Sequence, residues 1–368
     1  MPISAMDAIS PAFEHAKQQL LRPFRFAQWV RLALVGLLAG ELSSGGGCNS
    51  SINLPSTHHP QGSEQFLGAT LPPGMLHHPA MTAGLITSLV LIGFVLMVLL
   101  IYVSSVMRFI LFDSIIAKEC HIRRGWAKRR SQGLRLFVWQ ILLMLISFAA
   151  LFVLIGVPLG SAWAFGWFTR PSEHLLPLVL GGILLFLVLL ALFAVLVAVH
   201  VMTKDFVVPQ MAMENISAAE GWRRLWNWMM ADKLGYGGYM GMKFLLAIGA
   251  GIAFGIITII VVLLLLIPIG GFGVVAVLAG KAAGLIWNFH TITLAVVAGC
   301  VAFVIFMFAI SFVSVPAIVF FPAYSIYFFA PRYPALATLL WPQSPAAVAS
   351  NPTPTEPPPV PPTTAPFG

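Results

Sequence analysis

Long uninterrupted runs of apolar residues constrain this chain more than any other feature of its sequence. Five runs are long enough to cross a membrane, namely residues 85–107, 136–159, 178–202, 244–267 and 292–315. The hydrocarbon core of a bilayer is roughly 30 Å thick, and about 20 helical residues cross it. Charged residues make up only 9% of the 368-residue chain, against roughly 25% in ordinary soluble domains. These features exclude a water-soluble fold and predict an all-α integral membrane protein.

A sixth apolar run, residues 26–42, is shorter and contains Arg31, so it is either a span or a helix lying on the membrane surface. Counting it as a span places eighteen of the twenty Lys and Arg residues on one side, eight of them between Arg108 and Arg135. Only Arg170 and Lys281 then lie on the other side. Because cytoplasmic loops carry an excess of Lys and Arg, we predict six transmembrane helices with both termini in the cytoplasm. Arg31 is expected to reach back to the cytoplasmic interface.

Two stretches that each follow a predicted span align without gaps. Residues 112–126 read FDSIIAKECHIRRGW and residues 208–222 read VPQMAMENISAAEGW, and each ends in a Gly-Trp pair. Val315-Pro316 follows the last span in a similar place, and a helix precedes the first span. Since two spans separate successive copies, the copies share one orientation. The sequence therefore predicts three parallel repeats over residues 1–330, each an interfacial helix followed by a membrane hairpin.

The predicted interfacial helices carry the residue types that collect at membrane surfaces. Ser217 and Glu220 form the Ser-x-x-Glu pattern of a helix N-terminus. Trp side chains anchor helices at head-group depth, and Lys or Arg attract anionic lipids. The candidate anchors are Trp29, Trp126, Trp222 and Trp226. The candidate anionic-lipid contacts are Arg123, Arg124, Arg129, Arg130, Arg223 and Arg224. The alternative interpretation is that these helices only orient the spans that follow them.

Two segments outside the spans have an irregular composition. Residues 43–81 contain no Lys or Arg but hold two histidine pairs, His58-His59 and His77-His78. Imidazoles bind zinc and copper, yet this spacing fits no typical site, so we expect no metal and no cofactor. From Pro331 onward the chain is rich in Pro, Thr, Ala and Ser, a composition that cannot bury a core. Residues 331–368 are therefore predicted to form a disordered cytoplasmic tail.

Ionisable residues are absent from the middles of the predicted spans, where transporters and proton pumps usually place them. His200 is the candidate nearest to a span interior, while Asp113 and Asp205 lie just beyond spans, where we expect water to solvate them. No metalloprotease, phosphate-binding-loop or nucleophile-elbow motif occurs in the sequence. A lipid-active enzyme would instead need a shared pocket for Asp113, His121, His200, Asp205 and Glu214.

Several short motifs resemble those of a known group of proteins. They are Leu21-x-Pro23-Phe24, Trp29-x-Arg31-Leu32, Asp205-Phe206-Val207-Val208-Pro209 and Gly221-Trp222-Arg223. Over residues 5–330 the chain resembles an uncharacterised group of bacterial polytopic membrane proteins. That group is similar to the membrane domain that some bacteria fuse to a glycerophosphodiester phosphodiesterase. The catalytic barrel and its His-Arg-Gly pattern are absent here, so the resemblance implies a bacterial inner-membrane location and an accessory role, without that activity.

The functional prediction is a non-enzymatic membrane scaffold or accessory protein. Its expected partners are membrane lipids, contacted through the interfacial helices, and not nucleic acid. A transporter or channel for an apolar or amphipathic solute is the alternative, and it would require a water-accessible cavity at the depth of the membrane midplane. A lipid-active membrane enzyme is the third hypothesis.

Overall fold

Helices account for nearly all of the described chain, which in this computed structural model comprises residues 4–41, 79–167, 174–282, 284 and 289–341. No strand occurs within these ranges. The long apolar helices are α4 (Pro79–Ala117), α5 (Ile122–Ala164), α6 (Leu175–Met202), α9 (Lys233–Ala282) and α10 (Phe289–Val313). Each contains a segment long and apolar enough to cross a membrane. The prediction of an all-helical chain with these five apolar helices is confirmed.

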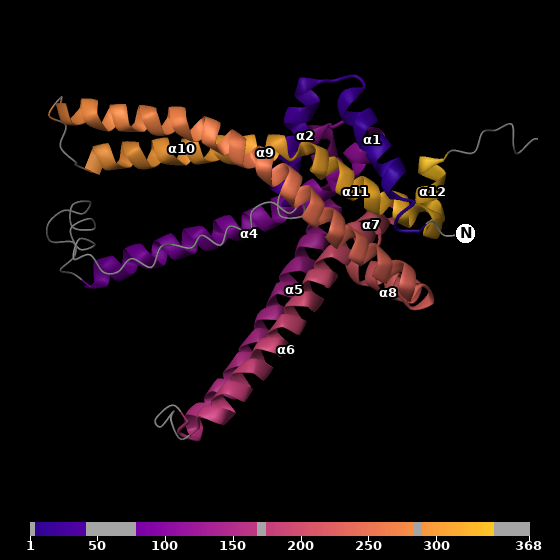
Figure 1. The fold of residues 1–368 in the computed structure, drawn as a ribbon, viewed down its shortest axis with the longest axis horizontal. Helices are drawn as coiled ribbons and strands as arrows, with labels where there is room; N and C mark the ends of the chain where they lie inside the picture. The colour runs from indigo at the N-terminus through magenta and orange to yellow at the C-terminus, as the bar shows by residue number, and fades with distance from the viewer. Residues whose placement is uncertain (1–3, 42–78, 168–173, 283, 285–288, 342–368) are drawn as a thin grey trace, which may run out of the picture.

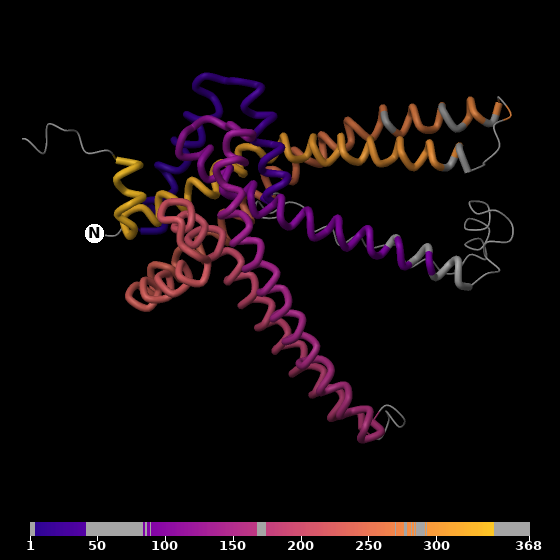
Figure 2. The backbone as a smooth tube through the Cα atoms, turned by 180° about the vertical axis from the view of Figure 1, so that it is seen from behind, coloured from indigo at the N-terminus to yellow at the C-terminus, as the bar shows by residue number. Residues whose placement is uncertain are grey.

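The shorter helices gather in a compact hub, from which the long helices extend as three arms (Figures 1 and 2). One arm is α4, the second is the α5–α6 hairpin and the third is the α9–α10 hairpin. The α4 and α9–α10 arms extend to the same side of the hub, whereas the α5–α6 arm diverges from them. The hub contains α1 (Ile9–Leu21), α2 (Phe26–Ala39), η3 (Thr203–Val207), α7 (Val208–Glu214), α8 (Ala218–Ala231), α11 (Val315–Phe329), η4 (Ala330–Arg332) and α12 (Pro334–Leu340).

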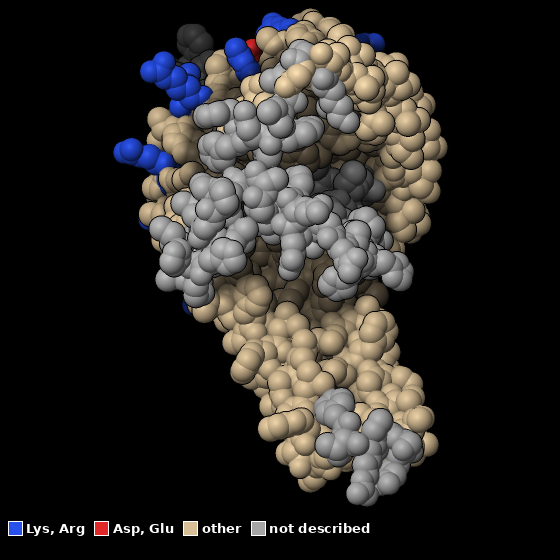
Figure 3. Space-filling view, turned by 90° about the vertical axis from the view of Figure 1, so that its left-hand side faces the viewer, with Lys and Arg blue, Asp and Glu red and all other residues tan. Residues whose placement is uncertain are grey.

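The arms bury little of their apolar surface within the protein. In the most apolar 18-residue windows of α5, of the α6 helix and of α9, no residue is buried. The view onto the ends of the α4 and α9–α10 arms shows charged side chains only along the upper and left margins of the described surface (Figure 3). Apolar surface on this scale is unfavourable in water. The arms therefore belong in lipid, as expected of a multi-pass membrane protein.

An aromatic cluster forms the centre of the hub. Phe206 of η3 contacts Tyr236, Tyr239, Phe328 and Phe329, with ring centroids 5.0–6.0 Å apart. Such pairs contribute about 0.5–1.5 kcal/mol each beyond the burial of their area. Because Tyr236 and Tyr239 belong to α9 and the two phenylalanines to α11, the cluster joins three separate elements of the chain.

The first predicted span is where the structure differs most from the prediction. Helix α2 has 14 residues, or about 21 Å at 1.5 Å per residue, which is less than the roughly 30 Å of a hydrocarbon core. It ends at Gly40, which adopts a left-handed conformation (φ 75°). The carbonyl of Ala39 accepts hydrogen bonds from Ser104 Oγ and Arg108 Nε, both at 3.3 Å. Thus α2 reaches only the hub end of α4, and six spans remain a prediction, since residues 42–78 lie outside the described ranges.

The start of the predicted disordered tail is folded, which corrects that prediction. Residues 330–340 form η4 and α12, and Leu336 is fully buried. Arg332 Nη2 donates to Asp232 Oδ2 at 2.8 Å, and this hydrogen bonding holds the pKa of Asp232 below its ordinary value. Tyr333 Oη donates to Glu214 Oε1 at 2.6 Å. These contacts supply the stabilisation that composition alone did not reveal, and residues 342–368 lie outside the described ranges.

The two Gly-Trp pairs of the predicted repeat occupy similar close contacts. A Cβ atom on Gly125 would lie 3.0 Å from Ile110, and one on Gly221 would lie 2.8 Å from Val207. In both cases the glycine lets its helix approach the end of the preceding one. The copies differ afterwards, because α5 runs unbroken into its arm whereas α8 ends at Ala231 and α9 begins at Lys233. The threefold repeat remains a prediction that this shared contact supports.

Replacement of Gly133 by alanine is expected to destabilise the crossing of α4 and α5. Gly133 is buried, and a Cβ atom there would lie 3.0 Å from the Cα atom of Val106. Because backbone cannot move aside cheaply, we expect Gly133→Ala to lower the free energy of unfolding by about 1–3 kcal/mol. Thermal unfolding in detergent measures this change. Gly156→Ala in the same helix is the control, since its added Cβ would have no described atom within 4 Å other than those of its own helix backbone and chain neighbours. Equal melting temperatures for the two variants would contradict the prediction.

Candidate functional site

A cleft of about 960 Å³ lies where the three arms leave the hub, and it is lined by residues of α2, α4, α5, α6, η3 and α10. Along α4 the lining residues extend from Gly93 to Arg108, a distance of about 22 Å at 1.5 Å per residue. Pockets for small molecules usually have volumes of roughly 300–1,000 Å³. The cleft therefore has room for a ligand of substantial size.

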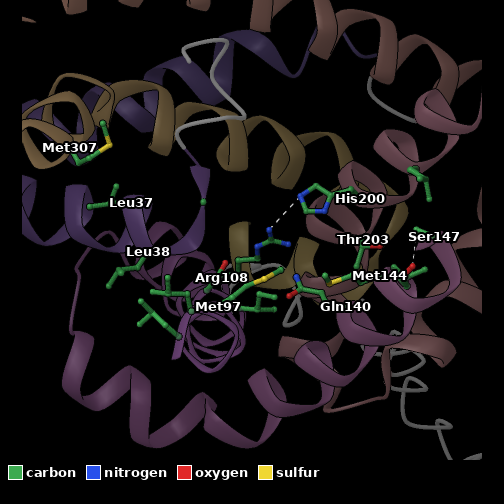
Figure 4. Close-up of a pocket in the computed structure, with 18 of the residues that line it drawn as sticks. Leu37, Leu38, Met97, Arg108, Gln140, Met144, Ser147, His200, Thr203 and Met307 are labelled. Carbon is green, nitrogen blue, oxygen red and sulfur yellow. Dashed lines mark hydrogen bonds between the residues drawn. The ribbon is translucent and has the colours of Figure 1, made fainter. Parts of the chain in front are cut away.

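The two ends of the cleft differ in polarity. Towards the arms its walls are apolar, with Leu96, Met97, Leu100, Met144, Leu196 and Met307 among the lining residues. At the hub end the lining includes Arg108, Gln140, His200 and Thr203 (Figure 4), together with Ser104 of α4. Ser147 is polar but lies farther along α5, and its hydroxyl donates to Leu143 of its own helix at 2.7 Å. The cleft thus combines a long apolar section with one polar end.

Arg108 is the charged side chain at the polar end. Its Nε donates to the carbonyl of Ala39 at 3.3 Å, and its Nη2 lies 3.4 Å from His200 Nε2 (Figure 4). Its Nη1 is buried and has no hydrogen-bond partner among the described residues. A buried donor without a partner costs roughly 1–3 kcal/mol, and more when it is charged. Arg108 therefore brings a positive charge to the wall of the cleft and has one donor without a partner among the described residues.

Two buried ion pairs lie next to Arg108. Lys204 pairs with Glu41, and Lys243 pairs with Asp205, and all four side chains are at least nine-tenths buried. Tyr239 Oη also donates to Asp205 Oδ2 at 2.8 Å. Glu41 and Asp205 both lie close enough to attract the charge of Arg108. We call Glu41, Arg108, Lys204, Asp205 and Lys243 together the charged layer.

The short π-helix η3 carries one residue of each of these two ion pairs. Pro209 lacks the N–H that would bond the carbonyl of Asp205, and its ring crowds that carbonyl, so a regular α-helical turn is disfavoured here. The chain instead forms π-helical turns over Thr203–Val207. Such turns occur often at functional sites. In this one, Thr203 lines the cleft, while Lys204 and Asp205 enter the charged layer.

The expectation that water solvates Asp205 is wrong. Asp205 is 2% exposed and lies inside a helix that continues from Leu175 to Glu214. A buried carboxylate requires an ion pair and hydrogen bonds to offset its lost hydration. Lys243 provides the ion pair and Tyr239 a hydrogen bond. Both residues belong to α9, whereas Asp205 belongs to the helix that continues α6. The sequence signal that could have identified the pair is the scarcity of carboxylates, since only 12 residues are Asp or Glu.

The predicted arginine contacts fall into two groups. Arg123, Arg124 and Arg130 are exposed on the first turns of α5. Arg223 and Arg224 lie on α8, where both donate to Glu220. Hydrogen bonds from Arg224 and Arg223 lower the pKa of Glu220. These five arginines are placed where lipid head groups could reach them.

Arg129 differs from the other predicted arginines, because it lies inside the protein. It is 6% exposed and forms two hydrogen bonds to Asp113, of 2.7 and 2.6 Å. Its Nη1 also donates to the carbonyl of Ala212 at 2.7 Å. The prediction that Arg129 contacts lipid is therefore wrong. It instead links α4, the start of α5 and α7.

Three of the four predicted tryptophan anchors pack against the protein. Trp29 donates to the carbonyl of Leu20 at 3.0 Å, and Trp222 donates to Thr203 Oγ1 at 3.0 Å. Trp126 meets Tyr102 edge to face, with ring centroids 6.1 Å apart. Trp226 is 53% exposed. Among the four, Trp226 is thus the one whose ring is free to enter a membrane interface.

The residues required for a lipid-active enzyme do not meet in one pocket. His200 lines the cleft and Asp205 is paired behind it, whereas Asp113 and His121 line a separate groove of about 700 Å³ on the hub. Glu214 accepts hydrogen bonds from Tyr333 and Arg224 elsewhere. No group of three His, Cys, Asp or Glu side chains arranged to hold a metal occurs among the described residues. The histidine pairs His58-His59 and His77-His78 lie outside those residues.

Replacement of Lys243 by methionine is expected to leave Asp205 as an uncompensated buried charge. Breaking such a pair typically costs about 3–5 kcal/mol, so Lys243→Met should lower the melting temperature strongly. The double variant Asp205→Leu/Lys243→Met should recover part of this loss, because it removes both charges. Lys17→Met breaks the exposed pair with Glu14 and should leave the melting temperature near that of the wild type. A double variant no more stable than Lys243→Met would contradict the prediction.

Comparison with known proteins places the chain in a family. No curated protein and no solved structure matches it, so the resemblance to the membrane domain of phosphodiesterases remains a prediction. The family whose model does match is described as a family of unknown function, DUF7544, and the match covers residues 3–339. That range includes the hub, the arms and the cleft. The chain therefore belongs to the DUF7544 family of unknown function.

Proposed function

We propose that this protein is a non-enzymatic, lipid-binding accessory protein of the bacterial inner membrane, and that its cleft holds a membrane lipid. The carrying observation is the cleft itself, whose apolar walls run along α4 towards a polar end at Arg108. Membrane lipids have the same division into a long apolar part and a compact polar part. No catalytic step is part of the proposal.

The position of the cleft between the arms supports this proposal. The outer surfaces of α4, α5, α6 and α10 are largely exposed and apolar, so lipid tails surround them in a membrane. Half of a hydrocarbon core is about 15 Å thick, and the cleft extends about 22 Å along α4. An acyl chain can therefore lie along the apolar walls while its head group remains at the hub.

Exposed basic residues on the surface of the hub also support contact with lipid. Arg123, Arg124 and Arg130 are exposed at the start of α5, and Arg223 on α8 has a 76% exposed side chain. Basic side chains near a membrane surface gain about 1 kcal/mol each from anionic lipids. Together with the exposed ring of Trp226, they favour a hub that lies at the cytoplasmic interface. This orientation agrees with the predicted cytoplasmic location of both termini.

A transporter for an amphipathic solute is the second candidate, and the length of the cleft is the observation that favours it. Transport would require the bound solute to leave on the far side as well. Vesicles containing the protein and a fluorescent lipid test this possibility, because transport transfers the dye-labelled lipid between leaflets. An accessory protein that only holds a lipid leaves the rate of transfer unchanged.

Narrowing the cleft should remove the bound lipid. Gly93 on α4 and Met144 on α5 both line it, so the double variant Gly93→Trp/Met144→Trp introduces two large side chains into its walls. We expect the wild type to retain lipid after purification in detergent and the double variant to retain at least about tenfold less, since a tenfold loss needs only ~1.4 kcal/mol. Native mass spectrometry of the protein–lipid complex provides the measurement.

The matched control places two tryptophans on the same helices outside the cleft. A Cβ atom on Gly84 of α4 or on Gly156 of α5 would have no described atom within 4 Å other than those of its own helix backbone and chain neighbours, and neither residue is among the described residues that line the cleft. Gly84→Trp/Gly156→Trp should therefore retain lipid as the wild type does. Equal lipid retention by both double variants, or no retained lipid in the wild type, would refute the proposed function.

A further inference from the structure

We infer that the occupant of the cleft is a phospholipid with a net negative head group, and that Arg108 binds its phosphate. This inference rests on the proposed function and specifies the class of lipid. It is carried by three observations, which concern the hydrogen bonding of Arg108, the charges around it, and the absence of carboxylates from the part of the cleft lining that the structure describes.

The first observation is the hydrogen bonding of Arg108. Its Nε and Nη2 are engaged with Ala39 and His200, while the buried Nη1 has no partner among the described residues. The neighbouring hydroxyls are already used, because Ser104 donates to Ala39 at 3.3 Å and Thr203 donates to Val199 at 2.7 Å. Phosphate and carboxylate oxygens are the acceptors that suit a guanidinium best, and phospholipids carry a phosphate. A phosphate in the cleft would supply Arg108 with the anionic partner that no described carboxylate provides by an ion pair.

The second observation is the balance of charge. The charged layer contains three cations, Arg108, Lys204 and Lys243, but two anions, Glu41 and Asp205. The two lysines pair with the two carboxylates, so the excess positive charge belongs to Arg108. An unpaired charge away from water is costly, and buried charges are normally paired. A ligand with one negative charge would balance the layer.

The third observation is that, among the described residues, no Asp or Glu lines the cleft, whereas Arg108 and His200 do. A carboxylate at the polar end would repel an anionic head group and attract the ammonium group of a zwitterionic lipid. Its absence leaves the cleft selective for negative charge. The ion-paired carboxylates of Glu41 and Asp205 are buried and are not among the residues that line the cleft.

The test compares two phospholipids with identical acyl chains, phosphatidylglycerol and phosphatidylcholine. Each is titrated against the full-length protein in detergent, and binding is followed by native mass spectrometry. We expect the wild type to bind phosphatidylglycerol at least about tenfold more tightly, because the ammonium group of phosphatidylcholine cancels the negative charge of its phosphate and so cannot balance the charge of Arg108. Arg108→Gln should lose this preference while still binding phosphatidylcholine, and Arg108→Lys should keep part of it. Arg25→Gln, which changes an exposed arginine that does not line the cleft, should behave as the wild type.

Each remaining outcome has a defined meaning. Equal affinities of the wild type for the two lipids would overturn the inference but leave the proposed function intact. No binding of either lipid would remove the proposed function itself. Displacement of phosphatidylglycerol by inorganic phosphate or glycerol phosphate at comparable concentrations would show that the site takes a soluble oxyanion, which also overturns the inference. If Arg108→Gln does not fold, the preference of the wild type and its partial retention in Arg108→Lys still decide the question.

Discussion

Contacts in the hub have to hold the three arms, because lipid provides no hydrophobic force between apolar helices. The arms bury almost none of their most apolar surface within the protein. Their relative positions depend instead on buried polar and aromatic contacts at their hub ends. The pairs of Asp205 with Lys243 and of Glu41 with Lys204 each join separate elements, and Phe206 packs between α9 and α11. The orientation of each arm follows from these contacts.

The cleft is a consequence of the same arrangement. Since the arms meet at the hub and diverge beyond it, a wedge of space remains between them, with the charged layer at its closed end. Arg108 is held there by the carbonyl of Ala39 and by His200. The contacts that stabilise the hub therefore also place a cationic donor at the head of an apolar cleft. The same few residues therefore stabilise the hub and form the polar end of the proposed lipid site.

Local features of the fold could be predicted from local sequence. The five long apolar helices follow directly from their composition, and Ser217 caps α8 by accepting a hydrogen bond from Glu220 N at 3.3 Å, as its pattern predicts. Helix ends were less predictable, because α4 and α9 extend well past their apolar runs into the hub. That extension carries Arg108 and Lys243 into helices, whereas the prediction placed both in polar segments at the membrane surface. Of the polar end of the candidate site, His200 was therefore identified from the sequence, whereas Arg108 was missed.

The sequence by itself determined that this chain is helical and belongs in a membrane, since apolar runs of this length leave no other favourable environment. Only the tertiary structure decided which charges are buried, because Asp205 and Lys243 are 38 residues apart and meet through the packing of η3 against α9. It likewise decided that Arg129 is buried while Arg130 is exposed. Which charges are buried depends on which helix faces meet. Because no hydrophobic force orients apolar helices against one another in lipid, the apolar pattern of the sequence carries little information about those faces.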